Sequence, residues 1–230
     1  MKLIKNYICL LVFIVGLLLS EEALAQQTFI TVPSPDILPP GNLMLKGSFR
    51  FRPFEPDTFT RLSPSATYGI GFGSEITAGV NTTIREDTDV NMDLQVKKVF
   101  TIVDTTKLTV GSRLLPNLKD NVSPQNFTYS HVSTQLKRVN TRLLSGIYVA
   151  NRNKSFLPDK VGVILGLEQP VTDKLRIALD WTSRNESYGN LAVGAKYRPV
   201  PTVSITGGIL IPNGGRSKLA FLVSISKYFQ

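Results

Sequence analysis

Two residues, His131 and Ser133, have types and a spacing that could support nucleophilic catalysis. Side chains two apart on an extended strand point to the same face, so a histidine base could stand beside a serine nucleophile. His131 is the single histidine of the chain, and this spacing arises easily by chance. We therefore keep a hydrolase only as a remote alternative and expect no catalytic residues and no enzymatic activity.

The sequence offers little to hold a metal ion. Beyond His131, the usual nitrogen and sulfur ligands are limited to one cysteine, Cys9, which lies in an apolar run near the amino end. A typical site needs three or four such ligands. We expect neither a metal site nor a cofactor.

A larger set of candidate functional residues consists of charged side chains that alternate with apolar ones in short extended runs. The members are Lys46, Arg50, Arg52, Asp93, Lys97, Arg113, Glu168, Arg176, Asp180, Lys196 and Arg198. Basic residues outnumber acidic ones in this set, and the net charge of the whole chain is +9. The excess predicts one of two arrangements. Cross-strand ion pairs could fill a narrow interior, with Arg176, Asp180 and Lys196 as expected members. Alternatively, the residues could line a passage that favours small anions.

The elements that carry these residues are predicted to be β-strands, because no segment after Gly41 has a helical period of apolar residues. Apolar and small or polar residues alternate in twelve runs. They cover residues 43–52, 65–72, 75–85, 91–102, 107–115, 127–138, 141–150, 161–169, 174–183, 191–198, 202–211 and 218–230. The sixth and seventh runs are ambiguous in phase, so the predicted strand count has a range of 10–14.

The connections between the runs alternate in length. Short turns such as Gly73-Ser74 follow even-numbered runs, and longer polar loops such as 53–64 and 116–126 follow odd-numbered ones. This pattern is typical of bacterial outer-membrane barrels. The polar faces are rich in Gly, Ser and Thr, which suits a crowded inner wall better than the solvent face of a soluble sandwich. We predict an all-β fold, a closed antiparallel up-and-down transmembrane β-barrel of about twelve strands, with a soluble β-protein as the alternative.

The first 25 residues have the composition of a cleaved signal peptide. Lys2 and Lys5 precede an apolar run at residues 8–19, and small residues at Ala23 and Ala25 provide a cleavage site. The run is too short to span a bilayer as a helix. We expect cleavage after Ala25; the alternative is an uncleaved amino-terminal anchor.

Residues 26–40, QQTFITVPSPDILPP, form a proline-rich lead-in. Proline lacks a backbone donor, so this segment is not expected to be an interior strand. It would lie in the periplasm or inside the barrel lumen. The predicted organisation is therefore a signal peptide at 1–25, a lead-in at 26–40 and a barrel at 41–230.

Aromatic residues lie near the ends of several runs, as in the interfacial girdles of membrane barrels. The predicted girdle residues are Phe51, Phe72, Phe100, Trp181, Tyr197, Tyr228 and Phe229.

Residues 41–230 resemble the small outer-membrane barrels of Gram-negative bacteria, a porin-like group. The resemblance rests on the export signal, the rhythm of runs and loops, the phrase LRIALDWTSRNESYGNLAVGAKYRP and the closing run KLAFLVSISKYFQ with its aromatic Phe229. Two departures are Lys227, where an apolar or aromatic residue is usual, and Gln230 after the aromatic.

This resemblance implies a protein of the cell outer membrane, inserted by the barrel-assembly machinery through its carboxyl-terminal strand. Its partners would be outer-membrane lipids and lipopolysaccharide, and not nucleic acid. We favour a porin-like channel for small solutes, with a preference for anions, over a non-conducting structural or surface-interaction barrel.

The remote hydrolase alternative comes from a resemblance to outer-membrane phospholipase, a twelve-stranded barrel with a His-x-Ser pair on a strand. In that family Asn-Gly follows the serine, whereas Thr134-Gln135 follows it here.

Overall fold

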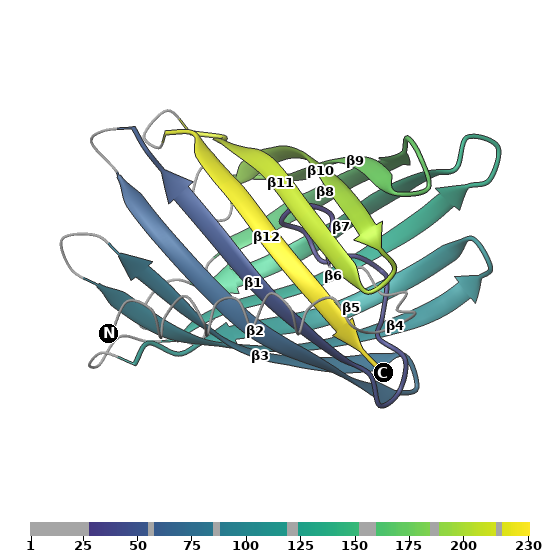
Figure 1. The fold of residues 1–230 in the computed structure, drawn as a ribbon, viewed down its shortest axis with the longest axis horizontal. Helices are drawn as coiled ribbons and strands as arrows, with labels where there is room; N and C mark the ends of the chain where they lie inside the picture. Colours follow the sequence, from purple (N-terminus) through teal and green to yellow (C-terminus); the bar gives the residue numbers. More distant parts are fainter. Residues whose placement is uncertain are drawn as a thin grey trace, which may run out of the picture.

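The computed structural model describes residues 28–54, 58–84, 88–118, 124–151, 160–184, 189–214 and 218–230. Within these ranges, twelve strands form a closed antiparallel barrel. Each strand pairs with its sequence neighbours, and β1 pairs with β12 to close the ring (Figure 1). The predicted all-β closed barrel of about twelve strands is confirmed. The expected signal peptide, residues 1–25, lies outside the described residues.

The strands alternate up and down around the ring. Their bounds are β1 (Leu43–Arg52), β2 (Phe59–Gly71), β3 (Ser74–Ile84), β4 (Asp89–Val103), β5 (Thr106–Leu115), β6 (Gln125–Leu136), β7 (Thr141–Asn151), β8 (Lys160–Pro170), β9 (Leu175–Thr182), β10 (Asn190–Val200), β11 (Val203–Pro212) and β12 (Ala220–Phe229).

The largest difference from the predicted bounds is at β2, which begins at Phe59 instead of residue 65. Pro64 led us to assign this stretch to a loop. In the structure Pro64 stands opposite Gly47 of β1 and interrupts the register with β3, where pairing stops at Leu62 and resumes at Ser65. A proline removes one ladder donor, and a strand that is paired on its other side tolerates that loss.

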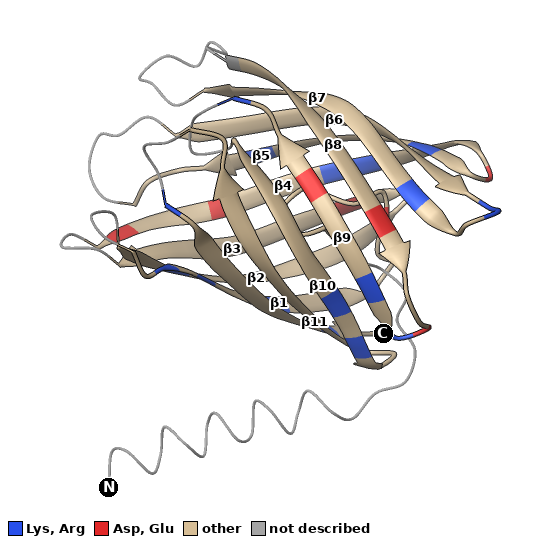
Figure 2. Cartoon of the chain, turned by 90° about the horizontal axis from the view of Figure 1, so that it is seen from above, with Lys and Arg blue, Asp and Glu red and all other residues tan. Residues whose placement is uncertain are grey.

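The outer wall is apolar. Side chains such as Val96, Ile147 and Val161 are 51%, 56% and 59% exposed, and similar residues project outward from every strand. Figure 2 shows that charged residues take up only short patches of strands that are otherwise tan. A continuous apolar exterior of this kind is stable when it contacts lipid. Among the described residues, no helix is long and apolar enough to cross a membrane.

Most of the predicted girdle aromatics lie on this outer wall. Phe72, Phe100 and Tyr197 are exposed near the short-turn end. Near the long-loop end, Phe51 stacks on Phe221 with ring centroids 5.2 Å apart, and Trp181 Nε1 donates to Asn213 Oδ1 at 3.0 Å.

The placement of Tyr228 was wrong. Its side chain is 2% exposed and packs inside the barrel with Leu38 and Met44. The reason is strand parity, because Tyr228 shares a face of β12 with the buried residues Ser224 and Ser226.

The same end of the closing strand contains Lys227, one of the two departures noted in the sequence. Lys227 is next to the half-buried Phe229 and 5.8 Å from its ring, and its Nζ donates to Thr202 Oγ1 at 3.1 Å in the β10–β11 turn. A long lysine side chain can thus carry its charge to a polar turn while its stem stays beside apolar neighbours.

The lumen contains the proline-rich segment. Residues 28–40, which we call the plug, enter the ring of strands (Figure 1), with residues up to Leu38 inside it and Pro39 and Pro40 exposed at its end. Phe29, Ile30, Val32 and Leu38 of the plug are at most 2% exposed. The sequence left open whether this segment lies in the periplasm or in the barrel lumen, and in the structure these residues lie in the lumen. The interior of the barrel is therefore partly filled by a peptide without regular secondary structure.

Candidate functional site

The plug packs against one side of the lumen. Phe29, Ile30 and Val32 form a single apolar cluster with inward-facing residues of β6 to β12. Those wall residues are Phe127, Tyr129, Leu144, Tyr148, Ala150, Ile164, Ala178, Ala192, Leu210, Ala220 and Leu222. Large apolar residues of β6 and β7 thus face inward, which reverses the usual polar lining. This reversal explains why the phase of these two strands was ambiguous in the sequence.

Glycines in the wall make room for the plug. A Cβ added at Gly194 would lie 2.8 Å from Ile30 Cδ1, and one at Gly208 would lie 2.9 Å from Ile30 Cγ2. At Gly69 the added carbon would meet the backbone carbonyl oxygens of Leu38, at 2.7 Å, and of Pro39. The wall therefore fits the plug closely at both ends, which we call the tip (residues 30–32) and the base (residues 38–40).

Replacing Gly69 with alanine is expected to lower the free energy of unfolding by about 1–3 kcal/mol, the usual cost of overpacking. The clash is with backbone oxygens, which cannot rotate away. Urea unfolding followed by the fluorescence of Trp181, the single tryptophan, would measure the change. Gly47→Ala is the matched control, because a Cβ there has nothing within 4 Å. Equal stability of the two variants would contradict tight packing at the plug base.

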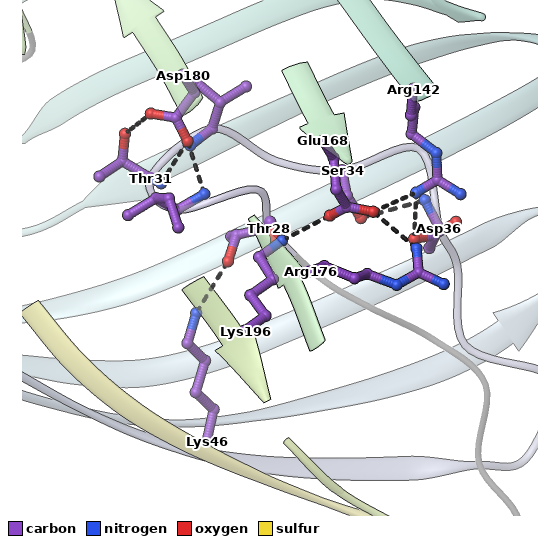
Figure 3. Close-up of polar contacts among 12 residues, drawn as sticks. Thr28, Thr31, Ser34, Asp36, Lys46, Arg142, Glu168, Arg176, Asp180 and Lys196 are labelled. Atoms are coloured by element: carbon purple, nitrogen blue, oxygen red, sulfur yellow. Dashed lines mark hydrogen bonds and ion pairs between the residues drawn. The ribbon is translucent and has the colours of Figure 1, made fainter. Parts of the chain in front are cut away.

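Asp180 of β9 binds the tip of the plug (Figure 3). Its Oδ2 accepts hydrogen bonds from the backbone N–H groups of Ile30, Thr31 and Val32 at 2.7, 2.8 and 3.2 Å. Its Oδ1 accepts another from Thr31 Oγ1 at 2.7 Å. Asp180 itself is fully buried. One carboxylate thus satisfies three consecutive backbone donors that would otherwise be buried without partners.

Further side chains of the wall bind the body of the plug. Glu75 Oε2 accepts from Leu38 N at 2.9 Å, and Glu75 Oε1 forms an ion pair with Lys97 Nζ at 2.9 Å. The same Lys97 ammonium donates to the carbonyl oxygen of Asp36 at 2.6 Å. Across the lumen, Lys196 donates to the carbonyl of Thr28. The plug is therefore held largely through its own backbone groups.

Glu168 of β8 is the centre of the densest charge cluster (Figure 3). It is fully buried and lies 2.8 Å from Arg176, 3.0 Å from Lys196 and 3.8 Å from Arg142. Arg142 also pairs with Asp36 of the plug at 2.8 Å. We expected Arg176, Lys196 and Asp180 to form cross-strand pairs. The two bases instead share Glu168, and Asp180 is committed to the plug.

The lumen next to the plug, on the side of β1 to β6, is a polar cavity of about 400 Å³. The predicted residues Lys46, Arg50, Asp93, Lys97 and Arg113 line it. Asp93 accepts from Arg113 Nε at 2.8 Å, so this acid is already neutralised by one base.

Arg50 and Arg61 stand directly opposite each other on β1 and β2, and both line the cavity. Arg61 Nε donates to Thr83 Oγ1 at 2.9 Å. Among the residues that the structure describes, no hydrogen bond or ion pair is found for the Arg50 side chain. Like charges in directly opposite positions repel, so this pair concentrates positive charge at one part of the cavity wall.

Arg61, Glu75 and Arg142 were not in the predicted set. Arg61 lay in a stretch assigned to a loop because of Pro64, and Arg142 lay in a run of ambiguous phase. Glu75 directly follows the β2–β3 turn, where the strand pattern has only begun.

The two remaining predicted charges lie near the strand ends. Arg52 is at the end of β1, with its guanidinium 4.7 Å from the ring of Phe59. Arg198 is near the short-turn end of β10, where its backbone N–H donates to the carbonyl of Lys174 at 2.8 Å.

His131 and Ser133 are both buried on the inner face of β6. The imidazole stacks on Tyr129 with ring centroids 5.8 Å apart. Neither ring nitrogen has a hydrogen-bond partner within the described part of the chain, so no bond to Ser133 activates the serine hydroxyl. In the same described ranges, no three acidic, histidine or cysteine side chains are grouped to hold a metal ion.

No known family model matches the chain, and neither does the sequence of any curated protein. Solved structures do match. A KdgM porin is similar with a TM-score of 0.61 and 9% sequence identity, over 81% of this chain and 99% of that one. The fold is that of a porin barrel. A second structure, KdgM porin in complex with disordered oligogalacturonate, matches with a TM-score of 0.60 and 9% identity, over 82% of this chain and 99% of that one.

Proposed function

We propose that this protein is a porin-like channel of the outer membrane that passes small solutes, with a preference for anions, through the part of the lumen that the plug leaves free. The observation that supports this most directly is the cavity along β1 to β6, with Lys46, Arg50 and Arg61 in its lining. Bases outnumber acids in this lining, and an excess of one charge sign raises the local concentration of the opposite ion and favours its passage through a pore.

The pairing of Arg50 with Arg61 adds to this proposal. Two facing guanidinium groups repel each other, and an anion between them would relieve the repulsion. Guanidinium groups bind carboxylate and phosphate oxygens with two parallel hydrogen bonds, so solutes bearing these groups are the expected cargo. The KdgM porin structure in complex with disordered oligogalacturonate indicates that a barrel of this fold can hold an anionic saccharide.

The sequence and the apolar exterior together support a location in the outer membrane. A signal peptide at residues 1–25 would direct export, and the assembly machinery would recognise the last strand. Lipids and lipopolysaccharide would then surround the exposed wall.

Planar-bilayer recording in a salt gradient tests the channel and its selectivity. We expect the wild-type protein to be anion-selective and Arg50→Glu/Arg61→Glu to reverse the sign of the reversal potential, because the substitutions replace two cations by two anions in the cavity. Lys137→Glu/Arg138→Glu makes the same charge change in the exposed β6–β7 turn and is the control. It should keep the wild-type sign.

The alternative is a barrel that does not conduct and has a structural or surface-interaction role. The packed plug is the observation in its favour. A correctly folded protein that shows no conductance steps, either intact or without residues 28–38, would favour this alternative and contradict the channel.

A further inference from the structure

The plug is bound to the barrel but is not part of its sheet. Its described backbone-to-backbone hydrogen bonds do not reach a strand: Phe29 N donates to Val32 O at 2.8 Å, and Pro39 O accepts from Asn42 N, just beyond the plug, at 3.2 Å. Its contacts with the wall are made by side chains of the strands, chiefly Asp180, Glu75 and Lys97. The prolines at positions 33, 35, 39 and 40 lack the donors that strand pairing would require. The plug can therefore leave without breaking a strand ladder.

The base of the plug has the geometry of a hinge. Pro39 and Pro40 stiffen the chain immediately before Gly41, whose φ of +82° is readily adopted by glycine. A Cβ at Gly41 would have nothing within 4 Å, so no neighbour fills the space beside its α-carbon. Beyond it, the chain is fixed to the sheet, since Gly41 N donates to Gly69 O at 2.9 Å and Gly69 N donates to Asn42 O at 3.0 Å. Rotation about Gly41 would swing the whole plug, at the cost of the hydrogen bond from Gly41 N to Gly69 O.

At the tip, residues 30–32 and opposite this hinge, the backbone donors are bound by one side chain. Asp180 makes four hydrogen bonds with residues 30–32, and three of them are to backbone donors. The loss of its charge would leave these donors with a weaker acceptor in a buried site. The wall does not need the plug to stay closed. Every strand pairs with two neighbours, and Glu168, Arg176 and Lys196 pair within the wall itself.

We infer that the plug is a gate: residues 28–40 move out of the lumen as one unit about Gly41, and Asp180 is the latch that keeps it closed. Opening adds the volume of the plug to the existing cavity and widens the path for solutes. This inference rests on the proposed channel function, but the movement of the plug can be measured without any ion flow.

The first arm of the test uses Asp180→Asn, which keeps the shape of the latch and removes its charge. In planar bilayers we expect a severalfold rise in mean conductance. Asp104→Asn, in the exposed β4–β5 turn, is the control and should behave like the wild type. Heat-modifiable migration on a gel would show that both variants are folded barrels.

The second arm locks the gate. In Ile30→Cys/Gly208→Cys, the added Cβ at position 208 would lie 2.9 Å from Ile30 Cγ2, which brings the two cysteines within reach of a disulfide. Combined with Asp180→Asn, the oxidised lock should restore low conductance, and a reducing agent should release it. Equal conductance of the wild type, the latch variant and the lock in both redox states would overturn the gate while leaving the channel intact.

The third arm needs no conductance. Ser34 is fully buried in the plug, so Ser34→Cys should react slowly with a maleimide in an otherwise wild-type barrel and much faster together with Asp180→Asn. Faster labelling without conductance in any variant would support the movement of the plug and contradict the channel. Unchanged labelling would contradict the latch directly.

Discussion

Replacing Glu168 with glutamine is expected to lower the free energy of unfolding by about 3–5 kcal/mol, the usual cost of removing one partner from a buried ion pair. The carboxylate is fully buried and is the shared partner of Lys196 and Arg176, with Arg142 close by. The side chain of Lys196 is 4% exposed, so water cannot replace the lost charge. Urea-induced unfolding of the refolded protein in lipid or detergent would measure the loss.

Two controls distinguish this effect from a general effect of losing an acid. Asp173→Asn removes a carboxylate from the exposed β8–β9 turn and should leave stability unchanged. Glu168→Gln/Lys196→Met removes the stranded cation as well and should recover part of the loss. A loss below about 1 kcal/mol for Glu168→Gln alone would show that the cluster is screened like a surface ion pair.

Introducing an arginine at Ile225 is expected to cost about 2–4 kcal/mol, because this position is in the middle of β12 and projects from the outer wall. Arginine placed at the bilayer midplane of a barrel loses the hydration of its charge. The same urea unfolding experiment measures the cost, provided that the protein is folded in lipid vesicles.

Leu219→Arg is the matched control, since Leu219 is similarly exposed but precedes the strand at the long-loop end. Near an interface the same substitution should cost only about 0–1 kcal/mol. The difference between the two losses in the free energy of unfolding reports how deep each position lies in the membrane. If both arginines are tolerated equally well, the apolar wall does not face hydrocarbon.

Most of the wall could be predicted from the sequence because strand side chains alternate with a period of two. This pattern gave the twelve strands and the alternation of short and long connections. It failed where the inner face is apolar. Tyr129 and Tyr148 face inward against the plug, and Tyr228 faces inward beside Leu38, so apolar character no longer identified the outside.

The position of the plug and the pairing of the charges could not be obtained in the same way. The prolines of residues 26–40 exclude a strand, but they contain no information on which surface the segment contacts. The partner of Asp180 lies about 150 residues earlier in the chain, and no local pattern links the two. Only the closed ring brings Asp180 to the plug and gathers Arg142, Arg176 and Lys196 around Glu168.

The position of Leu38 has a consequence for the order in which the molecule assembles. Leu38 packs against Met44 of β1 and Tyr228 of β12, which are direct register partners where the first strand meets the last. The binding site for Leu38 therefore exists only after the two ends of the chain have met. Leu38 precedes every strand of the chain but is among the last residues to reach its final environment, and its burial reports that the ring is complete.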